Sequence, residues 1–174
     1  AVGTAVGLVA RIFMPGPAVA PKIPGAVWLI GIAGLFGYHF FYFTALRNAP
    51  AVEASLIAYL WPLLIVLLSA LGPGERLGLH HVVGALMGFA GAVLIVTRGQ
   101  GIALNPDYAF GYGIAFLAAF FWSSYSVLSR RFREVPTDVV TGFCLVTALL
   151  AIAAHLMLED PVWSQGIGQW LAVL

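Results

Sequence analysis

The chain has 174 residues, of which 61% are hydrophobic and only 9% are charged, and its formal net charge is +1. A soluble domain typically carries about 25% charged residues, so this composition excludes a protein whose whole surface is kept in water. The small net charge gives no electrostatic signature of nucleic-acid binding. The single cysteine, Cys144, cannot form an internal disulfide, and its apolar neighbours in the sequence favour a packing role.

The apolar residues fall into blocks separated by short polar, proline-rich or glycine-rich stretches. Each full block is long enough to cross a hydrocarbon core of about 30 Å as a helix that rises about 1.5 Å per residue. A buried helix of a soluble protein would explain one block but not a succession of them. Because the connections are short, consecutive helices must run antiparallel. We therefore predict an all-α integral membrane protein, built as an antiparallel transmembrane helix bundle.

In chain order, the blocks are 1–13, 26–46, 52–71, 79–97, 108–129, 138–158 and a last stub from about 168. The first and last blocks are incomplete, so we expect this sequence to be a piece of a longer protein. Local signals mark two helix starts. Asn105 followed by Pro106 is typical of an N-cap with a first-turn proline, and Thr137 is a candidate N-cap for the block that follows it.

The block 26–46 carries three polar aromatic side chains on one face. At about 100° per residue, Tyr38, His39 and Tyr42 share one arc, and Gly31 and Gly34 lie close to it. Small residues beside large aromatic ones predict a concave space where this helix meets its neighbours, and we interpret the three as lining it. Two alternatives stay open, namely an interfacial aromatic belt for the tyrosines and a hydrogen-bonded core position for His39.

The block 52–71 places a second set of groups on one arc, which comprises Ser55, Tyr59, Pro62 and Ser69. Pro62 cannot donate a backbone hydrogen bond and so frees the carbonyl of Ala58, one turn earlier. This predicts either a packing kink or a point where the helix flexes and exposes a backbone acceptor. Trp61 projects away from this arc and would line the same space only from its flank. Glu53, in the first turn, is placed where an acid favours the helix dipole.

The next two blocks differ in character. In 79–97, Gly84, Gly88 and Gly91 form a smooth stripe that indicates contact with another helix rather than a function. In 108–129, one face holds small, hydroxyl and indole side chains, namely Gly111, Ala115, Ala118, Trp122, Ser126 and Ser129. The serines either let helices approach closely or present donors to a solute, whereas Trp122 offers an apolar plate with one N–H. His155, near the end of 138–158, is interpreted as interfacial.

Orientation follows from lysine and arginine in alternate connections. The first, third and fifth connections, with their helix ends, hold Arg11, Lys22, Arg76, Arg130, Arg131 and Arg133. The second, fourth and sixth hold only Arg47 and Arg98. This asymmetry predicts that the loops near 14–25, 72–79 and 130–137 are cytoplasmic.

Enzyme signatures are absent from the sequence. It contains no H-E-x-x-H, no G-x-S-x-G, no P-loop and no pair of acids within an apolar block. His39 is the only titratable group deep in a block with aromatic company, and it has no acid near it in the sequence. We therefore predict no catalytic residue, no metal site and no cofactor.

Several motifs resemble those of one transporter family. The runs GYHFFYFTALRNAP at 37–50, EASLIAYLWP at 53–62 and GERL at 74–77 are similar to the drug/metabolite transporter superfamily (EamA-type). The block 84–96 and the run WSSYSVLSRR at 122–131 fit the same pattern. Within the superfamily, the YLWP stretch and the Tyr-His-x-x-Tyr cluster resemble the bacterial aromatic amino acid exporters. The resemblance covers nearly the whole chain.

The resemblance implies a ten-helix transporter made of two inverted five-helix repeats around a central cavity. On that pattern, 1–98 is the C-terminal part of the first repeat (helices 2–5) and 99–174 is the N-terminal part of the second (helices 6–7 and the start of 8). The first helix, the end of the eighth and the last two would be missing, so this chain is not expected to transport alone. The implied location is the bacterial inner membrane.

Carried over position by position, the resemblance implies a set of substrate-binding residues: Tyr38, His39, Tyr42, Tyr59, Trp61 and Trp122. We add Ser126 from helical geometry and assign Pro62 to helix flexing. The function implied is export of amino acids, foremost aromatic ones, by alternating access, with a small-molecule substrate and the lipid bilayer as partners. Two rivals stay open, namely a carrier of another small solute (drug, nucleotide sugar or polar metabolite) and a non-transporting membrane scaffold. Energy coupling, transport direction and oligomeric state are left open by the sequence.

Overall fold

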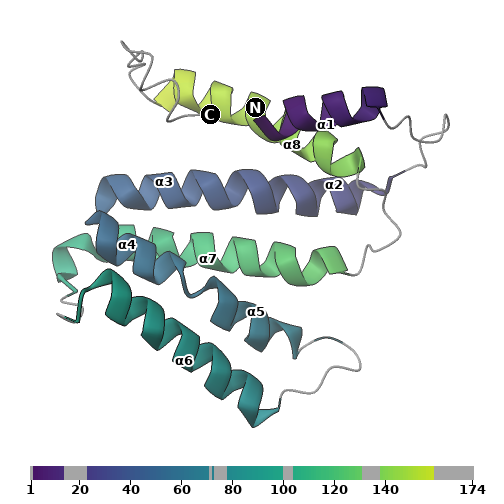
Figure 1. Cartoon of the computed structure of the whole chain (residues 1–174). Coiled ribbons are helices and arrows are strands. Elements are labelled where there is room, and N and C mark those ends of the chain that lie inside the picture. The colour runs from purple at the N-terminus through teal and green to yellow at the C-terminus, as the bar shows by residue number, and fades with distance from the viewer. Residues whose placement is uncertain are drawn as a thin grey trace. The chain divides into compact units, whose positions relative to one another are not determined.

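The structure is a computed structural model that describes residues 2–13, 23–70, 72, 78–99, 104–130 and 138–158. These residues are helical apart from short turns and connections, which confirms the all-α prediction (Figure 1). Among them, five helices are long and apolar enough to cross a membrane: Gly25–Asn48, Ala51–Ser69, Leu79–Val96, Pro106–Ser129 and Val139–Leu158. The predicted cap Thr137, the stub from 168 and most of the predicted cytoplasmic loops lie outside the described residues.

The chain divides into two compact units, of which one contains α1 (Val2–Phe13) and α8 (Asp138–Leu158). These two helices pack through glycines of α1. A Cβ at Gly3 would lie 3.3 Å from the Sγ of Cys144, and one at Gly7 would overlap the side chain of Thr141. Cys144 therefore has the packing role that its surroundings in the sequence predict. The bounds of α8 match the predicted block 138–158.

The other unit, Gly25–Arg133, begins with a continuous rod. It comprises α2 (Gly25–Ile32), a π-helical turn η1 (Ala33–Gly37) and α3 (Tyr38–Asn48). A π turn accommodates an extra residue in a helix, and such turns are frequent at functional sites. Because the turn immediately precedes Tyr38, the faces of α2 and α3 are not related by the regular rotation of an α-helix.

The second span of this unit is divided into α4 (Ala51–Ala58) and α5 (Trp61–Ser69). The predicted block 52–71 is therefore not one uninterrupted helix. Tyr59 and Leu60 lie between the two parts, with ψ near zero at Tyr59 (φ −66°, ψ 0°). The amide of Leu60 donates to the carbonyl of Ile57 at 3.1 Å, which tightens the turn. Pro62 follows as the second residue of α5, where its missing N–H is tolerated.

The remaining helices of the unit are α6 (Leu79–Val96), the short 3₁₀ turn η2 (Pro106–Tyr108) and α7 (Ala109–Ser129). The predicted cap is confirmed, because the Oδ1 of Asn105 accepts a hydrogen bond from the amide of Asp107 at 3.0 Å and Pro106 opens the turn. Helix α7 packs against α3, α4 and α5, whereas α6 packs against α5 and α4 (Figure 1).

The core of this unit is made of small residues. Ala45, Ala49, Ala54 and Ala115 form a buried cluster, which joins α3, α4 and α7. At Gly111 the backbones approach closely, since a Cβ there would lie 2.6 Å from the carbonyl oxygen of Asn48. Small residues at helix contacts are typical of membrane bundles, where tight packing replaces the hydrophobic effect.

The glycine stripe of α6 does not make the helix contact that its pattern predicts, within the part of the chain that the structure describes. A Cβ at Gly84, Gly88 or Gly91 would meet nothing within 4 Å. The stripe faces away from α4 and α5, so the prediction of a contact is wrong for this unit.

Candidate functional site

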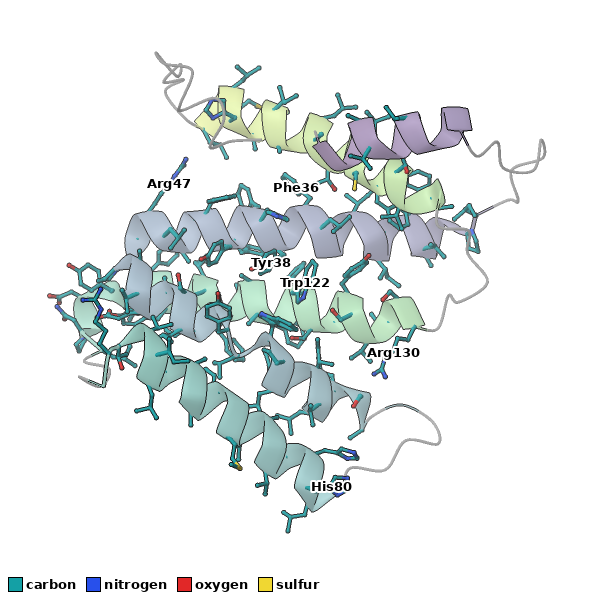
Figure 2. The ribbon with its side chains drawn as sticks, in the orientation of Figure 1. Phe36, Tyr38, Arg47, His80, Trp122 and Arg130 are labelled. Atoms are coloured by element: carbon teal, nitrogen blue, oxygen red, sulfur yellow. The ribbon has the colours of Figure 1, made fainter. Side chains whose placement is uncertain are left out.

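Aromatic side chains from α3 and α7 meet in what we name the aromatic cluster: Tyr38, Tyr42, Trp122 and Tyr125. The rings of Tyr38 and Tyr42 are stacked, with centroids 5.8 Å apart and planes 5° from parallel. The indole of Trp122 lies 5.1 Å from the ring of Tyr38 and 5.7 Å from that of Tyr125. Figure 2 shows Tyr38 and Trp122 near each other between the two helices. The structure therefore brings three predicted site residues together, from two segments far apart in the sequence.

His39 lies at the edge of this cluster rather than inside it. Its ring is exposed and meets that of Tyr38 edge-on at 5.2 Å. The Nδ1 lies 2.7 Å from the carbonyl oxygen of Leu35, and because a carbonyl only accepts, Nδ1 must carry the proton. In the neutral ring, Nε2 is then the acceptor. The hydrogen bond to Leu35 agrees with the hydrogen-bonded alternative for His39, although its ring is exposed among the described residues.

Tyr42 links two spans through its hydroxyl. This oxygen lies 3.0 Å from the Oγ of Ser55 on α4, and either group can donate. Tyr59 lies at the break between α4 and α5, with 49% of its surface exposed. The predicted arc of the second span is thus divided, with Ser55 on one side of the break and Ser69 at the far end of α5.

The break lies beside Pro62, from which the sequence predicts either a packing kink or a flexing point with an exposed backbone acceptor. The carbonyl of Trp61, on the other side of the break, accepts a hydrogen bond from the Oγ of Ser123 on α7 at 2.9 Å. Trp61 is therefore tied to α7 through its backbone, and its indole is half-buried.

Ser126, which helical geometry adds to the site, is bound to its own helix. Its Oγ donates to the carbonyl of Trp122 at 2.8 Å, so the hydroxyl keeps only acceptor capacity for another molecule. On α7, Ser123 reaches another span, and the sequence analysis did not select it. Its position among the buried small residues of α7 is the signal that could have identified it.

The predicted concave space beside Gly31 and Gly34 is wrong at Gly34. A Cβ at Gly34 would lie 2.3 Å from the Cγ of Tyr125, and one at Gly37 would lie 2.8 Å from the ring of Phe121. These glycines admit aromatic side chains of α7 against the backbone of the first rod. They serve close packing, and both lie within the π turn.

A second polar group lies near the other end of α7. The hydroxyl of Tyr112 donates to a carboxylate oxygen of Glu53 on α4, and it accepts from the amide of Asn105 at 3.3 Å. Glu53 was predicted only to favour the helix dipole, and Tyr112 was not predicted at all. This group joins the start of α4 to the start of α7.

The chemistry available at the aromatic cluster is stacking and hydrogen bonding. Phenol and indole rings supply apolar faces together with O–H and N–H groups, and the nearby break supplies backbone acceptors. Among the described residues, no group of three or more His, Cys, Asp or Glu side chains is placed to hold a metal ion. The arrangement suits binding of a small molecule with an aromatic ring.

Comparison with known proteins agrees with this chemistry. Residues 2–97 match the EamA-like transporter family. The chain is 53% identical over 174 residues to the aromatic amino acid exporter YddG of Ancylobacter novellus, which covers 99% of this chain and 60% of that protein. It is 27% identical to the YddG exporter of Salmonella typhimurium, over 86% of this chain and 54% of the relative. It is also 29% identical to the pseudopaline exporter CntI of Pseudomonas aeruginosa, over 98% of this chain and 58% of the relative.

A solved crystal structure is similar in fold, with a TM-score of 0.91 and 53% sequence identity. The match covers 99% of this chain and 59% of that one. The chain thus spans about 60% of the length of the relative that it matches at 53% identity. These matches confirm the resemblance to transporters that the sequence motifs indicate.

Proposed function

Because this chain belongs to the EamA-like transporter family, we propose that it forms part of a membrane exporter of aromatic amino acids. The observation that carries the proposal is the aromatic cluster, in which Tyr38 and Tyr42 on α3 face Trp122 on α7. Identity of 53% to a protein named as an exporter of aromatic amino acids supports this choice of substrate. The cluster would bind the ring of the solute by stacking.

The polar groups of the amino acid need both hydrogen-bond donors and hydrogen-bond acceptors in the site. In the proposed site, the Nε2 of His39 and the hydroxyl of Tyr59 lie at the edge of the cluster, together with the acceptors at the helix break. Trp61 and Ser126 complete the proposed set of substrate-binding residues. An amino acid carries an ammonium donor and a carboxylate acceptor, so backbone carbonyls suit the first and hydroxyl groups suit the second.

The complete transporter is proposed to have ten helices in two inverted five-helix repeats. In this arrangement, 1–98 belongs to the first repeat and 99–174 to the second. The greater length of the relatives supports the presence of further helices in the whole protein. We further propose insertion in a bacterial inner membrane, with the loops near 14–25, 72–79 and 130–137 cytoplasmic, as the distribution of lysine and arginine favours.

Transport is proposed to proceed by alternating access. Broken membrane helices whose unwound backbone lines the binding site occur in many transporters. The break at Tyr59 and Leu60, followed by Pro62, supplies such a feature here. Pro62 lets α4 and α5 change their mutual angle without loss of an intrahelical hydrogen bond at that position.

Transport by the full-length protein in lipid vesicles tests the proposal. We expect saturable movement of tryptophan, phenylalanine or tyrosine. Trp122→Ala and Tyr42→Ala should each lower apparent affinity about tenfold, because each loses a contact of roughly 1 kcal/mol or more with the ring. Trp122→Phe, which keeps an aromatic face, should retain most of the affinity. Unchanged affinity and rate in both alanine variants would show that the cluster is not the binding site.

The same vesicles decide between the proposed substrate and its rivals. A carrier of another solute, which the likeness to the pseudopaline exporter makes the second candidate, would move labelled aromatic amino acids no faster than empty vesicles. In a competition binding assay, a polar metabolite would then displace the bound ligand, whereas tryptophan would not. A scaffold would transport neither.

A further inference from the structure

One polar side chain in the middle of α7 has two partners. Ser123 is completely buried, and the residues one turn before it, Ala118 and Ala119, are buried as well. Its Oγ lies 2.6 Å from the carbonyl oxygen of Ala119 and 2.9 Å from that of Trp61. The first contact is the usual bond of a serine to its own helix. The second reaches another span, at the first residue of α5.

A hydroxyl group has one proton, so Ser123 cannot donate fully to both carbonyls at once. The proton is either shared in a three-centre bond or alternates between the two acceptors. When it is directed at Trp61, it fixes the first turn of α5 against α7. When it is directed only at Ala119, the serine is satisfied within its own helix, and that tie to α5 is lost.

The start of α5 depends on this bond more than an ordinary helix start would. It follows the break at Tyr59 and Leu60, and its second residue, Pro62, has no amide proton to donate. The position of Trp61 is therefore not set by a continuous helix running on from α4, and a bond from α7 can restrain it. On α7, the residue next to Ser123 is Trp122, which belongs to the aromatic cluster.

We propose that Ser123 is a positioning residue, whose hydroxyl holds the start of α5 and thereby sets the place of Trp61 relative to Trp122. One helical turn of α7 then presents an indole to the solute and a hydroxyl to the broken span. The expected effect on transport rests on the proposed function, whereas the structural tie can be tested without it. The alternative is that Ser123 bonds only to its own helix and does not position α5.

Hydrogen–deuterium exchange of the full-length protein tests the tie directly. Ser123→Ala should speed exchange of the amides at 63–66 about three- to tenfold, because one hydrogen bond that restrains this turn is lost. Ser123→Cys, which keeps the volume but donates weakly, should behave similarly if the alanine variant folds poorly. The matched control is Ser129→Ala on the same helix, since that hydroxyl donates at 3.2 Å to Ser126 of its own helix. Equal exchange in all variants and the wild type would overturn the proposal.

Transport kinetics separate positioning from simple stability. Misplacement of Trp61 should raise the KM of the Ser123→Ala variant about three- to tenfold, with a maximal rate per folded protein that stays close to the wild type. A fall in maximal rate with unchanged KM would identify a merely structural serine and refute the positioning role. If the wild type moves no aromatic amino acid, the proposed function fails, but the exchange experiment still decides the tie between Ser123 and α5.

Discussion

The two halves of α7 pack against their neighbours in different ways. From Gly111 to Ala119, which we name the small-residue half, buried glycine and alanine let the backbones of α3 and α4 approach closely. From Phe121 to Ser126, which we name the aromatic half, large rings fill the contact with the first rod and hydroxyl groups make polar bonds. The difference indicates that one half fixes the helices and the other carries the groups that suit a ligand.

The comparison predicts that added volume in the small-residue half has the largest effect on stability. Gly111→Ala places a methyl group against the backbone carbonyl of Asn48, which cannot move aside. We expect a loss of about 3 kcal/mol, at the upper end of the usual range for overpacking. The measurement is the thermal unfolding midpoint of the purified full-length protein.

A matched control lies two residues further along the same helix. A Cβ at Gly113 would meet nothing within 4 Å. Gly113→Ala should therefore leave the midpoint unchanged or raise it slightly, because alanine has the better helix propensity. Equal effects at the two glycines would contradict the close backbone contact at Gly111 on which the small-residue half depends.

Added volume in the aromatic half should destabilise the protein less than added volume in the small-residue half, and a second substitution can compensate for it. Gly34→Ala places a methyl group against the Cβ and Cγ of Tyr125, which belong to a side chain and not to the backbone of a neighbouring helix. We expect a loss of about 2 kcal/mol, together with weaker solute binding because Trp122 rests on Tyr125. Removal of the whole side chain in the double variant Gly34→Ala/Tyr125→Gly should restore part of the stability that the single Gly34 change loses, because the Cβ of Tyr125 itself lies 2.4 Å from the added methyl position. No recovery in a double-mutant cycle would argue against direct contact.

The smallest effect is expected from the polar group near the start of α7. Tyr112→Phe removes the hydrogen bond to Glu53 while it keeps the ring, so the unfolding midpoint should fall by less than in Gly34→Ala. Tyr108→Phe serves as the control, since Tyr108 contributes a ring contact to Tyr112. A larger fall in the unfolding midpoint for Tyr108→Phe than for Tyr112→Phe would contradict the assignment of a stabilising hydrogen bond to Tyr112.

Much of this fold could be predicted from the sequence, because long apolar blocks and helix caps are local signals. The block 138–158 and the cap at Asn105 are placed correctly, and the aromatic partners Tyr38, Tyr42 and Trp122 do meet. The motifs also indicated the transporter family that the comparisons show.

Other features depend on tertiary contacts that no local pattern contains. The π turn at Ala33–Gly37 lies where aromatic rings of α7 contact Gly34 and Gly37. The sequence prediction assumed a regular helical rotation from Gly31 to Tyr38, and it therefore predicted a concave space where these rings lie. Pro62 indicated a kink, but the helix breaks earlier, at Tyr59. Helical geometry selected Ser126 because it follows Trp122 by one turn. The serine of α7 that bonds to another helix is Ser123, which is adjacent to Trp122 in the sequence.

The π turn before Tyr38 also has a consequence for how such a site can change. A π turn takes up one extra residue without turning the helix that follows it, so a single-residue deletion within Ala33–Gly37 would restore ordinary α-helical winding and leave Tyr38 and Tyr42 facing the indole of Trp122. A deletion in a regular part of the same rod would instead rotate every residue after it by about 100°. The turn is therefore a place where the rod can lose one residue while the aromatic cluster keeps its tyrosines.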